Sequence, residues 1–334
     1  MTKPDALIAA MLQARHGVTA RIVSVRPHAD GPQGYSGAVL RYYDVAYMLC
    51  GITRQMMIVT KEASLDERRT LAWLGAHNTT VPFSYSADLE TEGTALSCLE
   101  YVADSTDPTA IGHDRKRKIA HALAMIHHAA FDRGKACEKA LPWLPHADHS
   151  FFAERIVDGC WRGPWQQLLT GRAYTDWFGI KHPATTPDGS FGVAFAAVTP
   201  AIETVAARFI EAMQSAWETA TGLTLVHTDL HGDHLRWQGG EARIIDWGQA
   251  RYGPLALDLP NLFSREESLL YREALIALGH DLPLGTFLAG YDAARPYPGF
   301  KYFGIGLWNW RHGDPAQRHK NVQYWIDMVL GAGR

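Results

Sequence analysis

The sequence predicts an α+β fold with two lobes: a small antiparallel β-rich lobe over residues 1–103 and a larger, mainly helical lobe over residues 104–334. Three observations lead to this prediction. The chain has 334 residues, more than one typical hydrophobic core requires. Apolar residues follow strand patterns through most of residues 18–102. Beyond residue 104 the apolar spacing becomes mainly helical, so the two halves are expected to differ in architecture.

The first lobe is predicted to contain mostly strands, with one helix between the third and the fourth. Helical spacing predicts an initial helix over residues 5–16 that ends at Gly17. Residues 65–77 return to a helical pattern, with Asp66 and Glu67 in the first turn, where the helix dipole favours acidic groups. The predicted strands cover residues 18–25, 38–49, 55–63, 81–87 and 94–102. GPQGYSG, residues 31–37, is predicted to be a loop because of its glycines and proline.

The second lobe is predicted to be built around helices. Residues 116–131 form a strongly amphipathic helical pattern, and residues 200–220 form another. Residues 142–191 are rich in aromatic side chains and irregular, and most of these aromatics are expected in the core. Two short apolar segments around Gly239–Gly240 predict a β-hairpin. From residue 258 onward the pattern is mainly helical.

Composition excludes several classes of protein. The chain is 47% hydrophobic and 20% charged, with a formal net charge of −3, so disorder and a nucleic-acid partner are not expected. No uninterrupted apolar stretch approaches the ~18 residues of a membrane span, and no signal peptide is apparent, so no membrane association is expected. Four scattered cysteines without a CxxC pair indicate free thiols and a cytoplasmic location.

Two aspartates carry the chemistry that the sequence suggests. Asp229 and Asp246 lie 17 residues apart, at the start and the end of the predicted hairpin. Because a hairpin brings its ends together, both carboxylates can face one cleft. One carboxylate near a divalent cation and one near a substrate hydroxyl is the arrangement that phosphoryl transfer needs. The alternative is that Asp229 caps a turn and Asp246 ends a strand.

The stretch VHTDLHGDHL…IIDWGQARYGPLALDL resembles the core of the aminoglycoside phosphotransferase and choline kinase family. These are small-molecule kinases with a protein-kinase-like fold. The resemblance implies that Asp229 is the catalytic base, that His227 supports its loop and that Asp246 binds Mg²⁺. It also implies that Asp258 braces the catalytic loop.

The same resemblance implies an ATP site in the first lobe. Lys61, at the end of the third predicted strand, matches the lysine that holds the nucleotide's phosphates, and Glu67 matches its acidic partner. The alternative for Lys61 is a solvated strand end. Gly34 and Gly37 fall where a loop covers the phosphates. Backbone groups near Glu100 and Val102 fall at the hinge that would bind adenine.

One position departs from the family pattern. The second metal ligand, normally asparagine five residues after the catalytic aspartate, is His234 in this chain. Mg²⁺ prefers oxygen ligands to imidazole nitrogen. His234 could therefore bind the metal directly, act through water, or leave only one ion firmly held, and the neighbouring Asp233 could supply an oxygen.

The sequence thus predicts an ATP- and Mg²⁺-dependent kinase that phosphorylates a hydroxyl of a small molecule. An antibiotic of aminoglycoside, nucleoside or peptide type is favoured as acceptor over a metabolite such as choline, homoserine or a sugar, and the aromatic-rich insert favours a ring-bearing acceptor. Two other classes remain open. The cluster over His227–His234 resembles the HxHxDH signature of metal-dependent hydrolases. The histidine at position 234 is also compatible with a protein that binds nucleotide without turnover.

Overall fold

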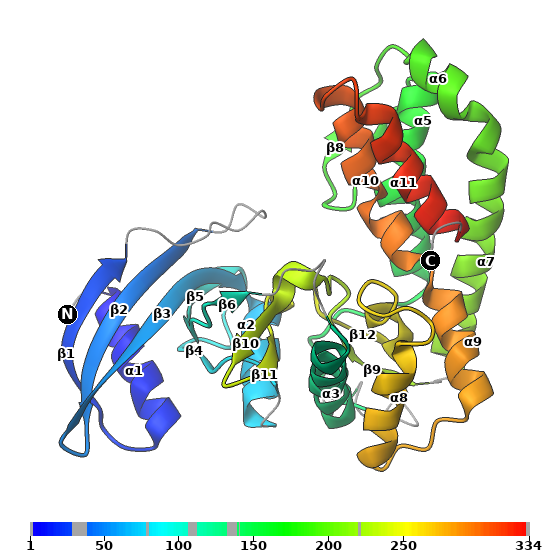
Figure 1. Cartoon of the computed structure of the whole chain (residues 1–334). Coiled ribbons are helices and arrows are strands. Elements are labelled where there is room, and N and C mark those ends of the chain that lie inside the picture. The colour runs from blue at the N-terminus through cyan, green and yellow to red at the C-terminus, as the bar shows by residue number, and fades with distance from the viewer. Residues whose placement is uncertain are drawn as a thin grey trace.

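A five-stranded antiparallel sheet, in the order β1-β2-β3-β5-β4, forms the smaller lobe (Figure 1). The computed structural model describes residues 3–28, 39–77, 80–105, 112–131, 139, 141–219 and 222–331. The strands are β1 (Arg21–His28), β2 (Leu40–Leu49), β3 (Ile52–Ser64), β4 (Ser84–Ser86) and β5 (Thr94–Glu100). Each overlaps one of the five predicted strands, although β1 lies three residues later than expected, β3 is longer and β4 is shorter.

Two helices accompany this sheet. The first, α1 (Lys3–His16), packs Ile8, Met11 and Leu12 into one hydrophobic cluster with sheet residues such as Ile58. The second, α2 (Leu65–Ala76), follows β3 directly, and the Ser64 side chain caps it by accepting the backbone N–H of Glu67. Since β3 and α2 are contiguous, Lys61 near the end of the strand and Glu67 in the first helical turn are brought close together.

The larger lobe is mainly helical, as predicted. Figure 1 shows it in two parts: α3, α8 and α9 lie with β9 and β12 in the lower part, while α5, α6, α7, α10 and α11 form the upper part. The helices are α3 (His113–Ala129), α5 (Gly163–Thr170), α6 (Gly189–Phe195), α7 (Thr199–Glu218), α8 (Ser268–Ala277), α9 (Leu284–Ala294), α10 (Tyr297–His312) and α11 (Arg318–Leu330). Short 3₁₀ segments η3 (Ala196–Val198), η4 (Gly232–His234), η5 (Trp247–Gln249) and η6 (Leu255–Asp258) connect them.

Short strands position the segment between α7 and α8. The predicted hairpin is present as β10 (Leu235–Gln238) and β11 (Glu241–Ile244), and Gly239 and Gly240 have the positive φ that its turn requires. A third strand, β6 (Asp104–Ser105), pairs with β10. The strands β9 (Leu223–Val226) and β12 (Arg251–Pro254) pair antiparallel, which brings the two ends of this segment together. The lobe boundary at residue 103 stays a prediction.

The aromatic-rich region is more regular than the sequence suggested. A π-helix, η2 (Phe151–Arg162), leads directly into α5, and the short strands β7 (Tyr174–Thr175) and β8 (Lys181–His182) pair after it. Trp161 and Trp165 are buried in the large core, whereas Phe178 is 73% exposed. Extended π-helix is rare and often occurs at functional sites. The periodicity of a sequence does not signal it, which explains why an irregular region was expected.

The helical run Gly189–Glu218 is long and apolar enough to cross a membrane, judged by length and composition alone. A single run of this kind is weak evidence, because core helices of soluble proteins meet the same criterion. Within it, Ile202, Ala206, Phe209 and Met213 of α7 are buried in the core of the larger lobe.

The start of α6 provides a test of stability. Asp188 Oδ1 accepts the backbone N–H groups of Ser190 and Phe191, and Asp188 Oδ2 accepts the indole N–H of Trp310. Burial opposes ionisation, but these hydrogen bonds prevail and lower the pKa of Asp188 to about 2. Asp188→Ala is expected to lower the free energy of unfolding by about 1 kcal/mol or more, measured by urea denaturation at pH 7.

The pH dependence of the free energy of unfolding separates the contribution of the Asp188 charge from that of its capping hydrogen bonds. Because the folded-state pKa of Asp188 is depressed, its contribution is fully present above pH ~4–5 and is lost as the pH falls toward about 2. Asp188→Asn keeps a capping oxygen but cannot titrate, so the stability difference from the natural chain should shrink as the pH falls. A difference that stays constant from pH 6 to pH 2 would contradict this account.

Candidate active site

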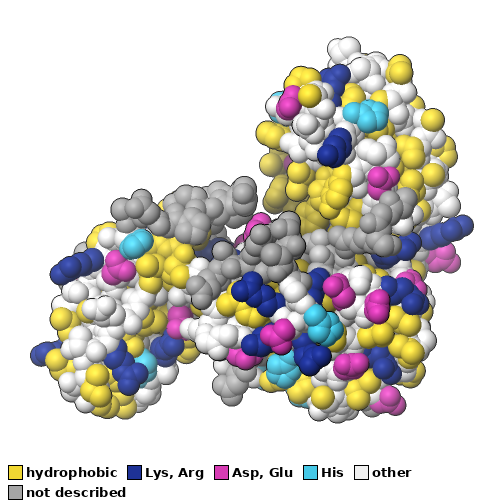
Figure 2. All heavy atoms as spheres, viewed as in Figure 1, with side chains coloured by type: hydrophobic (Ala, Val, Ile, Leu, Met, Phe, Trp, Pro, Cys, Tyr) yellow, Lys and Arg dark blue, Asp and Glu magenta, His cyan; other side chains and the backbone are white. Residues whose placement is uncertain are grey.

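A cavity of about 1040 Å³ lies between the two lobes. The space-filling view shows the molecule hollowed between the sheet-bearing lobe and the upper helical part (Figure 2). The cavity is lined by residues of both lobes, among them seven that the sequence predicted for the site: Lys61, Glu67, Glu100, Val102, Asp229, His234 and Asp246. Gly34 and Gly37 lie outside the described residues.

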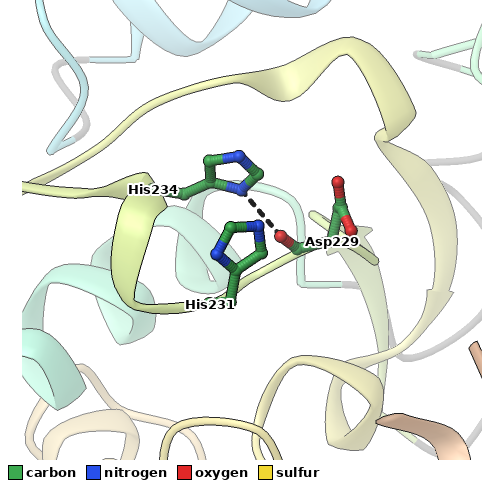
Figure 3. Close-up of side chains that lie close together, drawn as sticks. All are labelled: Asp229, His231 and His234. Carbon is green, nitrogen blue, oxygen red and sulfur yellow. Dashed lines mark hydrogen bonds between the residues drawn. The ribbon is translucent and has the colours of Figure 1, made fainter. Parts of the chain in front are cut away.

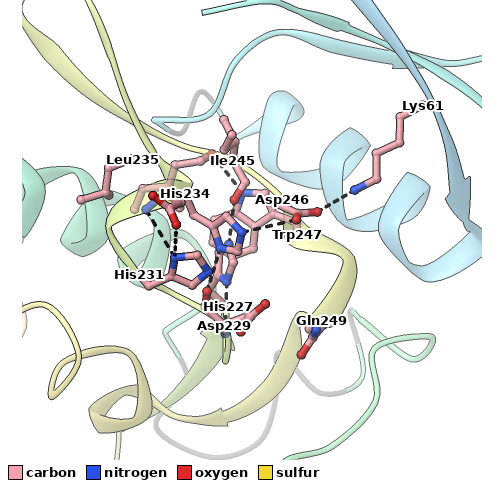
Figure 4. A network of polar contacts seen from close by, with 12 residues as sticks. Lys61, His227, Asp229, His231, His234, Leu235, Ile245, Asp246, Trp247 and Gln249 are labelled. Atoms are coloured by element: carbon pink, nitrogen blue, oxygen red, sulfur yellow. Dashed lines mark hydrogen bonds and ion pairs between the residues drawn. The ribbon is translucent and has the colours of Figure 1, made fainter. Parts of the chain in front are cut away.

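Lys61 links the sheet to the hairpin segment. Its ammonium group bonds Asp246 Oδ1 at 2.6 Å (Figure 4). It also bonds Glu67 Oε1 at 2.8 Å. Burial alone would lower the pKa of Lys61, but the two carboxylates outweigh burial and raise it, so the lysine is held as a cation. Burial would raise the pKa of Asp246, but His234 and Lys61 together hold it below its ordinary value. A fixed ammonium group beside an ionised carboxylate is suited to binding phosphates together with a cation.

Asp258 anchors the loop that follows β9 through hydrogen bonds to its backbone. Its two carboxylate oxygens accept the backbone N–H groups of His227, at 2.6 Å, and Thr228, at 2.8 Å. His127 lies 3.2 Å from the same carboxylate, and all of these groups are buried. Thr228 and Asp246 have φ of 60° and 65°, a conformation uncommon for residues other than glycine. Such strain persists where the surroundings fix it, and it clusters at functional sites.

Both ring nitrogens of His227 make hydrogen bonds within the protein. Its Nε2 donates to the carbonyl of Ile245 at 2.8 Å, and its Nδ1 accepts the backbone N–H of Asp229 at 3.2 Å. Burial is the main reason that the pKa of His227 falls to about 4, so the imidazole is neutral near pH 7. With both ring nitrogens engaged, His227 orients the Asp229 backbone and has no lone pair left for a metal.

The Asp229 carboxylate is held by helix α10. Tyr302 donates its hydroxyl to Asp229 Oδ1 at 2.8 Å, and Lys301 Nζ lies 2.9 Å from the same oxygen. Burial would raise the pKa of Asp229, but the charge of Lys301 and its hydrogen bond lower it, so the carboxylate is ionised. Among the described residues, Asp229 Oδ2 has no hydrogen-bond partner. This oxygen is therefore free to accept a proton from a bound molecule.

Lys301 was not recognised from the sequence. Its Nζ also bonds the carbonyl of Thr228, at 2.7 Å, and Gln249 Oε1, at 2.9 Å, so all three ammonium hydrogens have partners. Its side chain is only 5% exposed. In the sequence Lys301 lies among apolar residues of a helical pattern more than seventy residues beyond Asp229, and no spacing rule connects the two. Only the three-dimensional packing of α10 against the loop reveals the contact.

Lys301→Met is expected to lower kcat by about 10²-fold, because the carboxylate of Asp229 would lose the group that fixes Oδ1. The KM for ATP should change little, since Lys61 and Asp246 are untouched. Steady-state kinetics give both parameters, and Lys320→Met, an exposed lysine on α11, is the matched control. A Lys301→Met enzyme with normal kcat, or one with a large change only in the KM for ATP, would contradict this role.

Asp229, His231 and His234 place possible metal-ligand atoms within 4.8 Å of one another (Figure 3). His234 Nδ1 lies 2.7 Å from the carbonyl of Asp229, which can only accept, so Nδ1 carries a proton. His234 Nε2 then faces Asp246 Oδ2 at 3.4 Å, a pair suited to a shared cation. His231 Nδ1 instead accepts the backbone N–H of Asp233, so the neutral ring carries its proton on Nε2 and offers no lone pair there.

The predicted hinge around Glu100 and Val102 already makes hydrogen bonds within the protein. Glu100 bonds Arg15 and Gln238 through its side chain, and its backbone N–H donates to the carbonyl of Phe83 at 2.8 Å. That N–H is therefore not available to an adenine ring. Val102 is buried and lines the cavity. The roles expected of Glu100 and Val102 stay predictions.

The fold and the comparisons define a two-lobed phosphotransferase with a protein-kinase-like fold. Residues 52–297 match the model described as the phosphotransferase enzyme family, which is more than half of the chain. The chain therefore belongs to this family, and the predicted resemblance is confirmed. No curated protein sequence matches the chain.

Solved structures support the fold. A spectinomycin phosphotransferase in complex with ADP and spectinomycin has a TM-score of 0.56 and 14% identity over 97% of this chain and 96% of that one. An ethanolamine kinase from Plasmodium vivax has a TM-score of 0.54 and 12% identity over 97% of this chain and 86% of that one. At these identities the similarity confirms the predicted α+β, protein-kinase-like fold.

Proposed function

We propose that the chain transfers the γ-phosphoryl group of ATP to a hydroxyl group of a small molecule. The observation that carries this proposal is that Lys61, Asp246 and Asp229, from three separate segments, line one cavity. Lys61 and Asp246 form an ion pair there, and Asp229 presents a free carboxylate oxygen. A nucleotide's phosphates at the first pair and an acceptor hydroxyl at Asp229 would share the same space.

In this proposal the smaller lobe binds the nucleotide. Leu40, Val59, Leu99 and Val102 line the cavity and would contact the base, while Lys61, oriented by Glu67, would hold the phosphates. Asp246 and His234 would hold Mg²⁺, which would neutralise phosphate charge when bound. The carboxylate suits this ion well and the imidazole less so, because Mg²⁺ favours oxygen ligands.

The larger lobe would perform the proton transfer. Lys301 and Tyr302 fix Asp229 Oδ1, so Oδ2 would accept the proton of the acceptor hydroxyl. The hydroxyl oxygen forms the new bond to the γ-phosphorus as the bond from that phosphorus to the β–γ bridging oxygen breaks, and ADP leaves. Asp258 and His227 would act on the shape of the loop and not on the reacting atoms.

The two alternative classes, a metal-dependent hydrolase and a protein that binds nucleotide without turnover, are less well supported than a kinase. A metal-dependent hydrolase would need ligands from His227 and His231, but His227 has both nitrogens engaged and His231 offers no free Nε2 lone pair in its neutral form. A protein that only binds nucleotide would not require Asp229, yet Asp229 is held by two dedicated side chains from α10. The first observation disfavours a hydrolase, and the second favours turnover over nucleotide binding alone.

We further propose an antibiotic as the acceptor and the cytoplasm as the location, where ATP is available; Cys50, Cys98 and Cys160 are free thiols, consistent with that compartment. The purified chain, given γ-³²P-ATP and MgCl₂, should transfer label to at least one member of an antibiotic panel, and the gene should raise the corresponding inhibitory concentration in a sensitive bacterium. Label transfer only to choline, homoserine or a sugar would support the metabolic alternative. Tightly bound zinc without ATP binding would refute the kinase proposal.

A further inference from the structure

We infer that the acceptor is an uncharged compound with a flat ring system near its reactive hydroxyl, and not a polycation or a quaternary ammonium compound. This inference rests on the proposed function, because it assumes that Asp229 receives the acceptor's proton. It concerns the part of the cavity beyond Asp229, which is formed by η2, the β7–β8 segment and α10. Three features of that region support it.

The first feature is an apolar wall. Lys301, Ile305, Trp308 and His312 recur at the spacing of one face of α10, and all four line the cavity. Ile305 is 53% exposed and Trp308 is 61% exposed. The same helix therefore carries the group that fixes Asp229 and, about 10 Å further along its axis, a large indole ring. Yellow side chains border the hollow on this upper helical part (Figure 2).

Trp177 and Phe178, from the segment between β7 and β8, also line this part of the cavity. Phe178 is 73% exposed, so it has no apolar partner over most of its surface. Exposed apolar side chains that gather around a concave site indicate a ligand with apolar surface. A ring system placed between α10 and this segment would cover them.

The second feature is the lack of a free carboxylate in this wall. Asp176 lines the cavity there, but its Oδ1 accepts the backbone N–H groups of Phe178 and Ile180, and its Oδ2 lies 2.9 Å from His182 Nε2. Both carboxylate oxygens of Asp176 therefore have partners within the segment that carries Phe178, and neither is available to a ligand. The Asp229 carboxylate already pairs with Lys301. Asp233, 66% exposed, lies on the hairpin side of the cavity near His231. A polycation would find no unpaired carboxylates among the described residues of the acceptor wall.

The third feature is positive charge. Lys301 Nζ lies 4.9 Å from the centroid of the Trp177 ring and 5.7 Å from that of Tyr302. Both rings line the cavity with Asp229, and a cation of the protein already occupies their faces. Arg311 lines the same wall and donates to Gln167 at 2.6 Å. Because Lys301 already takes these ring faces, recognition of an ammonium group by the same rings is disfavoured.

The test compares acceptors by charge class. ADP release by the full chain with ATP and MgCl₂ is measured for kanamycin and spectinomycin, for choline, and for the uncharged ring compounds uridine and chloramphenicol, with ATP affinity measured separately. We expect the highest kcat/KM within the uncharged class. A cationic compound as the best acceptor, or no turnover of any uncharged ring compound, overturns the inference. Absence of ATP binding would instead indicate that the proposed function fails.

Variants of the wall give a second, independent readout. Trp308→Ala should raise the KM for the best acceptor about tenfold and leave the KM for ATP unchanged, because an exposed indole contributes to ligand stacking and not to folding. Tyr324→Ala, a 53% exposed aromatic on α11 outside the cavity lining, is the matched control. An equal effect of the two substitutions, or no effect of Trp308→Ala on the acceptor KM, would overturn the inference.

Discussion

Asp229→Asn is expected to lower kcat by ~10²–10⁴-fold, the range over which a positioned general base contributes to a rate. The amide keeps an oxygen for the Tyr302 hydroxyl but cannot accept the proton of an acceptor. The KM for ATP should be nearly unchanged, because Lys61 and Asp246, which would hold the phosphates and their cation, are not altered. Single-turnover kinetics with the best acceptor give the rate of the chemical step directly.

Two controls accompany this variant. The substitution leaves the buried Lys301 ammonium without its carboxylate, so thermal unfolding must show that the fold persists. Asp281→Asn, at an exposed position before α9, controls for loss of a carboxylate elsewhere in the lobe. Near-normal turnover by a folded Asp229→Asn enzyme would show that Asp229 is not the base.

Asp246→Ala should lower Mg²⁺-dependent turnover by about 10³-fold, because the phosphates would lose the carboxylate that holds their cation and Lys61 would lose one of its two partners. The structure should tolerate the change, since Lys61 keeps Glu67 and the Asp246 side chain is 41% exposed. Activity as a function of Mg²⁺ concentration is the measurement, with circular dichroism as the check on folding.

His234→Asn separates the two proposed metal ligands. It replaces a nitrogen donor with an amide oxygen, which Mg²⁺ prefers, so activity should persist and less Mg²⁺ should be needed for half-maximal rate. Retained Mg²⁺-dependent activity in Asp246→Ala would refute the metal role of Asp246. An unchanged Mg²⁺ requirement in His234→Asn would show that His234 does not contact the ion.

Much of the architecture could be predicted because it depends on local periodicity. The strands β1, β2, β3 and β5, the helix α2 and the hairpin around Gly239–Gly240 each have a short-range signal in the sequence. The π-helix η2 has none, because its hydrogen bonding differs from that of an α-helix while its mixture of apolar and charged residues is of the kind found in either.

The candidate site likewise contains residues that could be predicted from the sequence and residues that could not. Asp229 and Asp246 could be paired because a hairpin between them has few possible geometries, and the structure brings both into one cavity with Lys61. Lys301 and Tyr302 could not be found, because a contact between α10 and the loop depends on how distant helices pack. The protonation of His231 and His234 likewise depends on which backbone group each ring meets.

The position of Lys301 and Trp308 on one face of α10 has an evolutionary consequence. Inserting a single residue between them would rotate the indole by about 100° around the helix relative to the lysine. Changes in the length of α10 would thus damage catalysis and recognition together and be removed by selection. The β7–β8 segment is constrained differently: substitution of Phe178 leaves the hydrogen bonds that Asp176 accepts from backbone N–H groups in place, so this segment can change its side chains without a change of backbone.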